Sequence, residues 1–96
     1  MLPTFSSRAF LAPMAGVSDP ALRLQCKKMG AGLVVTEFTN IHSIIAKEKQ
    51  LKDHMKTIQE FIEFSDQERP LSIQLFGSDL LALEKAAKIV EPYFDI

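Results

Sequence analysis

The sequence predicts an α/β protein with a parallel sheet, and three observations support this class. Short strand-like runs at residues 10–12, 33–36 and 71–76 are each followed by a segment of helical composition. Loops that contain proline or glycine follow the first and third runs. Because the strand-then-helix unit repeats with short connections, its strands are expected to lie parallel in one sheet.

Length and composition limit the possibilities further. The 96 residues make at most one small domain, and 47% hydrophobic with 24% charged residues is typical of a folded globular chain. No apolar run approaches the roughly 20 residues that span a bilayer, and the N-terminus lacks signal-peptide features, so no membrane partner is expected. The single cysteine excludes an internal disulfide and favours the cytoplasm. His42 and His54 have no third ligand nearby, so we predict no metal site.

Charge is distributed unevenly along the chain. Residues 1–56 carry eight Lys/Arg against four Asp/Glu, whereas residues 57–96 carry three against eight. The basic half is compatible with one edge of a nucleic-acid footprint. The lysines between residues 47 and 56 alternate with acidic residues, however, and this pattern is more typical of a solvated helix face.

The first strand, residues 10–12, ends at Pro13, which has no backbone N–H to give to a sheet. Gly16 tolerates dihedral angles that other residues avoid, so a compact loop follows. Asp19 before Pro20 is typical of an N-cap with proline at the first helical position. Ligands of α/β proteins bind at the carboxyl ends of strands, so this loop is the first candidate site.

The next helix is expected over residues 20–29, with three side chains on its inner face: Leu22, Cys26 and Met29. The β-branched run at 33–36 suits a strand buried on both faces, with Glu37 at its carboxyl end. Residues 38–40 are expected to begin a connection. Residues 41–56 have helical composition, and residues 57–64 suit either a helix or an irregular strand.

The third unit is the strand at residues 71–76, after a polar turn. Gly77 lets the backbone turn closely, and Ser78 is the expected N-cap of a helix that Pro92 ends. Residues 94–96 have the composition of an opening fourth strand.

Gln74 lies inside that third strand, where a buried amide needs hydrogen-bond partners. Its side chain both donates and accepts, which matches the imide edge of a flavin ring. The alternative is a barrel-interior glutamine satisfied by backbone carbonyls, and residue chemistry alone favours that interpretation.

A parallel (β/α)₈ barrel of the TIM type needs about 250 residues, so the chain would supply its first three βα units and the start of a fourth strand. A small doubly wound sheet is the structural alternative. The Gly-x-Gly-x-x-Gly fingerprint of that fold is not found in the sequence.

Four blocks of the sequence, in order, resemble the tRNA-dihydrouridine synthases: residues 12–19 (APMAGVSD), 29–37 (MGAGLVVTE), 68–70 (ERP) and 73–79 (IQLFGSD). The resemblance implies that residues 1–96 are the N-terminal fragment of an FMN-binding TIM-barrel domain, which a helical domain follows. It also implies the activity: NADPH reduces FMN, FMN delivers hydride to C6 of a uridine in tRNA, and a cysteine protonates C5.

The resemblance assigns cofactor-binding residues by position. Pro13, Met14 and Ala15 match the first FMN-contacting loop of the family, and Gln74 matches the glutamine that hydrogen-bonds the flavin. Glu37 matches a recurrent Thr-Glu pair, for which both substrate contact and a carboxylate held by neighbouring amides remain open.

The chain also departs from the family pattern. The Asn-x-Gly-Cys-Pro motif that carries the proton-donating cysteine is not among the 96 residues, and Cys26, on the inner face of a helix, is a poor substitute. We therefore assign no catalytic residue and expect no turnover from these residues alone. Strand edges left exposed by a partial barrel favour self-association. Two alternatives stay open: another FMN-dependent pyrimidine oxidoreductase barrel, and a non-catalytic half-barrel interaction module.

Overall fold

The computed structural model describes residues 3–50 and 54–96, and its centre is a three-stranded parallel sheet of order β1-β2-β3. The strands are β1 (Phe10–Leu11), β2 (Leu33–Asn40) and β3 (Leu71–Phe76). The predicted α/β class and parallel sheet are confirmed over the described residues.

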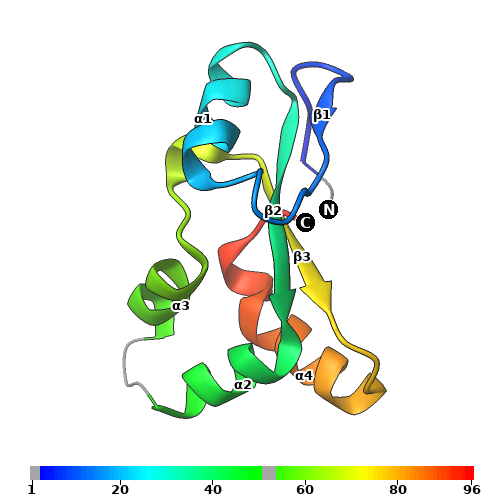
Figure 1. Cartoon of the computed structure of the whole chain (residues 1–96), viewed down its shortest axis with the longest axis vertical. Helices are drawn as coiled ribbons and strands as arrows, with labels where there is room; N and C mark the ends of the chain where they lie inside the picture. The colour runs from blue at the N-terminus through cyan, green and yellow to red at the C-terminus, as the bar shows by residue number, and fades with distance from the viewer. Residues whose placement is uncertain (1–2, 51–53) are drawn as a thin grey trace.

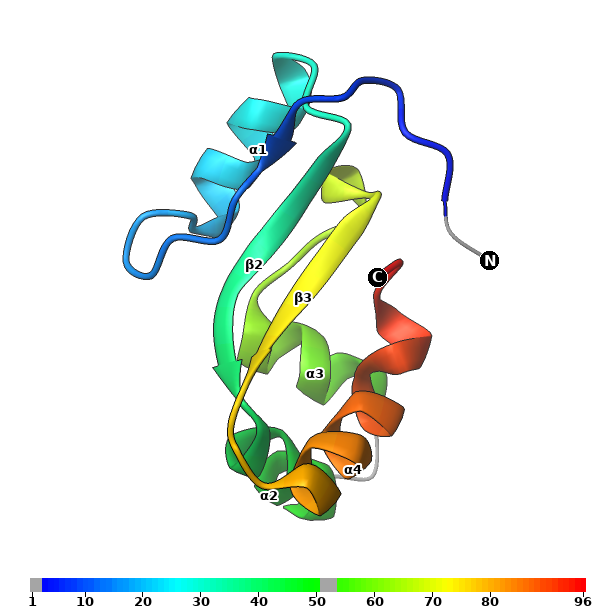
Figure 2. The ribbon, with the colours of Figure 1, turned by 90° about the vertical axis from the view of Figure 1, so that its right-hand side faces the viewer.

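The described residues also form four α-helices and two short 3₁₀ helices (Figure 1): α1 (Pro20–Lys28), α2 (Ile41–Gln50), α3 (His54–Ile62), η1 (Asp66–Glu68), α4 (Leu80–Val90) and η2 (Glu91–Tyr93). Figure 2 shows the strands in front of α1 and α3, so one face of the sheet is covered by helices. The ambiguous segment after residue 57 is helical up to Ile62. The predicted helix at 41–56 is two helices, and residues 51–53 of that prediction lie outside the described residues.

The hydrophobic core lies between the sheet and its helices. Each large apolar side chain in it contributes about 1.5–3 kcal/mol by burial. Its buried members come from β2, β3, α2, α3, α4 and the loop before η1: Val34, Ile41, Ile44, Ile58, Phe64, Leu71, Ala86 and Val90.

Helix α1 begins as predicted but buries a different residue. The N–H of Leu22 donates to the Asp19 carboxylate at 2.8 Å, which confirms the N-cap. The predicted inner face is wrong at Met29, which is the C-cap residue and is 80% exposed. The buried residue of α1 is Arg23, because acceptors on other segments surround its guanidinium.

Strand β2 is longer than predicted, since it continues through residues 38–40 to the first residue of α2. The Asn40 side chain accepts hydrogen bonds from the N–H groups of His42 at 2.8 Å and Ser43 at 3.4 Å. Asn40 therefore ends the strand and caps the helix at once, which leaves no room for the predicted connection.

Asp79, and not Ser78, is the N-cap of α4. Its carboxylate accepts a hydrogen bond from the N–H of Ala82 at 3.1 Å. We predict that Asp79→Ala lowers the free energy of unfolding by about 1 kcal/mol. Ser78→Ala, the matched control, should leave it unchanged in urea denaturation. An equal loss in both variants would contradict this assignment.

Residues 95–96 lie along the outer edge of β3, where a fourth strand was predicted. The N–H of Asp95 donates to the Leu71 carbonyl at 2.9 Å, and the N–H of Ile73 donates to the Ile96 carbonyl at 3.0 Å. These residues are not themselves assigned as a strand, so that prediction is met only in position.

The Asp95 carboxylate fastens this segment to the start of β3. It accepts from the N–H of Leu71 at 2.8 Å and from Nη1 of Arg69 at 3.1 Å. Burial opposes the charge on Arg69, but hydrogen bonds and charge from Asp66 and Asp95 outweigh it and raise the pKa of Arg69.

Across residues 3–50 and 54–96, none of the helices has both the length and the apolar character needed to cross a membrane.

Candidate ligand site at the carboxyl edge of the sheet

The loop after β1 is a tight turn that closes on Met14. The Met14 carbonyl accepts hydrogen bonds from the N–H groups of Val17 and Ser18, both at 2.9 Å. The N–H of Met14 donates to Oγ of Ser18 at 2.8 Å, and Ser18 is fully buried. Gly16 has a φ of +75°, as its residue type predicted. The turn is thus held by hydrogen bonds from its own backbone and from the Ser18 side chain.

A β-bulge in β2 holds the loop from the other side. Val35 pairs with Ser72 and Phe38 with Gln74, so β2 has an extra residue between these pairs. Bulges redirect side chains, and here the Glu37 carboxylate accepts a hydrogen bond from the N–H of Gly16. Of the two roles left open for Glu37, the structure contains the carboxylate held by a neighbouring amide.

Gln74 lies on β3 beside the same bulge, because its N–H donates to Oγ1 of Thr36 at 3.2 Å. The expectation of a buried glutamine is wrong: the side chain is exposed and bonds to none of the residues that the structure describes. None of the described helices covers this face of the sheet (Figure 2). The Met14 loop, the bulge and Gln74 therefore meet at one level of the sheet.

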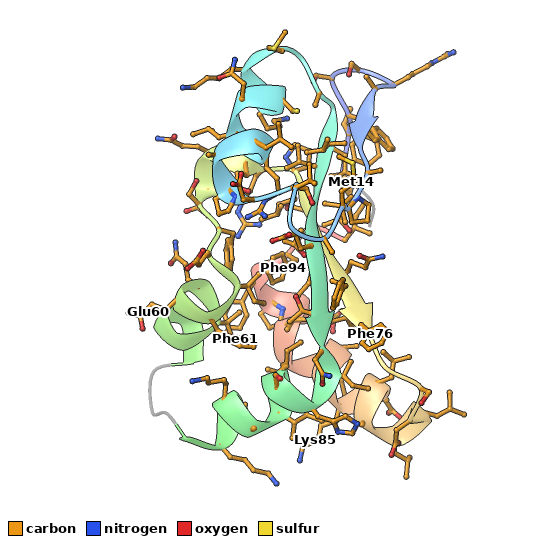
Figure 3. The ribbon with its side chains drawn as sticks, in the orientation of Figure 1. Met14, Glu60, Phe61, Phe76, Lys85 and Phe94 are labelled. Carbon is orange, nitrogen blue, oxygen red and sulfur yellow. The ribbon has the colours of Figure 1, made fainter. Side chains whose placement is uncertain are left out.

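Two aromatic rings extend the exposed face beyond Gln74. Phe38, the β2 partner of Gln74 in register, and Phe76 have ring centroids 5.4 Å apart at an interplanar angle of 53°. They are 52% and 57% exposed, respectively. In Figure 3, Met14 and Phe76 both lie to the right of β2, whereas Phe61 of α3 lies to the left.

The edge offers a defined set of groups to a ligand. Within the described part of the chain, the backbone N–H of Ala15 has no hydrogen-bond partner, while those of Met14 and Gly16 are occupied. The Gln74 amide adds a donor and an acceptor, and the Met14 side chain, 40% exposed, adds apolar surface. Apolar surface together with a few polar groups is the composition that suits a flat ring with a polar rim.

Cations and metal ligands are scarce at this edge. The three segments that form it, residues 12–19, 37–42 and 74–79, contain no lysine or arginine. Among the residues that the structure describes, no three potential metal ligands lie close enough together to hold a metal ion. Cys26 is half-buried and packs against the hydrophobic core.

Residues 10–96 match the family model described as dihydrouridine synthase. The chain belongs to the dihydrouridine synthase family. It is 35% identical over 85 residues to tRNA-dihydrouridine synthase B of Pseudomonas aeruginosa, covering 88% of this chain and 24% of that protein. The corresponding protein of Xanthomonas campestris pv. campestris is 33% identical, with the same coverage. A probable tRNA-dihydrouridine synthase of Rickettsia bellii is 34% identical over 86 residues, or 90% of this chain and 24% of its own length.

These findings confirm the resemblance read from the four sequence blocks. They also show that the chain spans about a quarter of the length of the curated dihydrouridine synthases that it matches. All four predicted cofactor-binding residues, Pro13, Met14, Ala15 and Gln74, lie inside the matched region.

Three residues that contribute to the carboxyl edge of the sheet were not predicted from the sequence: Ser18, Thr36 and Phe38. The hydroxyl of Ser18 contacts Met14, and the hydroxyl of Thr36 contacts Gln74. The sequence around these two residues does not indicate either contact. Phe38 was assigned to a connection, and the charged Glu37 before it interrupts the apolar pattern that would have indicated a longer strand.

Proposed function

We propose that this chain is the N-terminal part of the FMN-binding (β/α)₈ barrel of a cytoplasmic tRNA-dihydrouridine synthase. The whole protein would reduce uridine in tRNA to dihydrouridine, with NADPH as reductant. The observation that carries the proposal is the family match over residues 10–96, which contains the whole carboxyl edge.

The groups at the edge fit the ring of FMN. The free Gln74 amide suits the imide edge of the flavin, since it both donates and accepts. The unpartnered N–H of Ala15 supplies a second donor, and the Met14 side chain supplies an apolar contact for the ring. Bound FMN would supply the hydride, and the residues of this chain would bind and orient the ring.

The FMN phosphate has no lysine or arginine partner at this edge, because segments 12–19, 37–42 and 74–79 contain neither residue. Charge-assisted hydrogen bonds to a phosphate are worth about 1.5–3 kcal/mol each, or roughly tenfold or more in affinity. We therefore predict that the polypeptide of residues 1–96 binds riboflavin and FMN with dissociation constants within about threefold. Flavin fluorescence quenching measures both, and a strong preference for FMN would contradict this assignment.

The activity is tested on the full product of the gene that encodes this chain. The protein is incubated with FMN, NADPH and unmodified tRNA, and the tRNA nucleosides are analysed by mass spectrometry. We expect uridine to gain the mass of two hydrogen atoms at specific positions. Flavin reduction by NADPH with no change in any tRNA uridine would reject the proposed function.

Two variants connect the activity to the edge. Gln74→Leu removes the amide that would hold the flavin, so we expect at least about tenfold weaker flavin binding. Gln25→Leu alters an exposed glutamine on α1 and is the matched control. The polypeptide of residues 1–96, with Cys26 as its single thiol, should show no turnover under the same conditions.

A further inference from the structure

A buried ion pair lies behind the Met14 loop. Nε of Arg23 on α1 donates to Oε1 of Glu68 on η1 at 2.5 Å, and each side chain is only 2% exposed. The other Glu68 oxygen accepts from the N–H of Ser65 at 2.7 Å. Arg23 and Glu68 therefore compensate each other's charge, although they lie 45 residues apart in the sequence.

The remaining donors of Arg23 reach two further segments. Nη1 donates to the Ser18 carbonyl at 2.9 Å, and Nη2 donates to the Glu63 carbonyl at 2.7 Å. Three acceptors from three segments thus lie around one planar guanidinium. A lysine ammonium is a compact point charge and cannot reproduce this spread of donors.

Ser18 passes this arrangement on to the candidate site. Its carbonyl is held by Arg23, while its hydroxyl accepts from the N–H of Met14 at 2.8 Å and donates to the Met14 carbonyl at 3.1 Å. The position of Arg23 consequently sets the position of Ser18, and Ser18 sets the turn that presents Met14 and Ala15.

Stability alone does not account for the pair. Desolvation makes a buried ion pair no better for stability than packed apolar side chains of similar volume. Its specific product here is a fixed geometry. We propose that Arg23 is a positioning residue for the Met14 loop, with Glu68 holding its guanidinium in place; its bearing on flavin binding rests on the proposed function.

The experiment is hydrogen exchange, followed by mass spectrometry, on the full gene product and its Arg23→Lys variant. We expect amide exchange in segment 12–19 to be about tenfold faster in R23K, as for the loss of a charge-assisted hydrogen bond. Exchange in segment 33–36 should be unchanged. Arg69→Lys is the matched control, because Arg69 likewise donates to three acceptors, two carboxylates and a carbonyl, but lies before β3. It should leave segment 12–19 unchanged.

The proposal is overturned if segment 12–19 exchanges at the wild-type rate in R23K, or if all segments accelerate equally, which would indicate a merely structural role. If R23K does not fold, the double variant Arg23→Met/Glu68→Met removes both charges together and should show the same local acceleration. Failure of that variant to fold would also overturn the proposal.

Flavin titration of the same proteins tests the proposed function separately. Faster exchange of segment 12–19 with no flavin binding to any form would support the positioning role and reject the flavin site. Flavin binding that is equally tight in wild type and R23K, with unchanged exchange, would support the site and reject the positioning role.

Discussion

Glu68→Leu is expected to lower the free energy of unfolding by about 3–5 kcal/mol, because it leaves the Arg23 guanidinium buried without its carboxylate. The same change also removes the acceptor for the N–H of Ser65. Adding Arg23→Met should recover most of this loss, since two apolar side chains then replace two buried charges. Urea denaturation of both variants and of Arg23→Met alone completes the double-mutant cycle.

The control for this cycle is the pair of Glu84 and Lys88 on α4, whose charged atoms lie 2.6 Å apart. Its side chains are 60% and 70% exposed, so Glu84→Gln should cost no more than about 1 kcal/mol. A Glu68→Leu loss as small as that of Glu84→Gln would show that the Arg23 pair is not buried as the structure has it.

Ile41→Ala is expected to cost about 2–5 kcal/mol, because Ile41 is fully buried in the core. Ile41 is the first residue of α2, directly after the carboxyl end of β2, so its loss also loosens the candidate site. Ile45 lies one helical turn after Ile41 and is only partly buried, so Ile45→Ala should lower the free energy of unfolding by less.

The constraint on Gly77 is steric contact with Ile41 and not an unusual backbone conformation. A Cβ at Gly77 would overlap Cδ1 and Cγ1 of Ile41, so Gly77→Ala should cost about 1–3 kcal/mol through overpacking. In the Ile41→Ala background that cost should disappear, because the overlapping atoms are gone. Additive losses in urea denaturation would contradict this account of the close turn after β3.

Local signals were sufficient for the first loop. Pro13 ends the strand, Gly16 takes a positive φ and Asp19 caps α1, and each effect depends only on neighbouring residues. Asp79 was missed as a cap because two adjacent residues, Ser78 and Asp79, suit that position by type. Only the backbone path of the turn decides between them.

Long-range partners explain the other differences. An arginine is usually exposed unless it is paired, and the partner that allows Arg23 to be buried is Glu68, 45 residues away. The extension of β2 to Asn40 depends on pairing with β3 and on the bulge. Gln74 was predicted to be buried, but it points to the face of the sheet that no described helix covers.

The candidate site shows the same division. Pro13, Met14, Ala15 and Gln74 were identifiable from the family motif, and their roles toward FMN remain predictions. Their arrangement was not identifiable, because it depends on contacts between distant residues: Glu37 of β2 accepts from Gly16 of the loop, and Thr36 of β2 accepts from Gln74 of β3.

The most direct test of the central claim, that the carboxyl edge is a flavin site, is an NMR titration of the ¹⁵N-labelled protein with FMN. We expect the backbone amide of Ala15 and the side-chain amide of Gln74 to shift. The signals of the backbone amides of Leu71 and Asp95, which lie at the amino end of β3, should not shift. Shifts at Leu71 and Asp95 without shifts at Ala15 and Gln74 would contradict the claim, and so would a titration in which none of them moves.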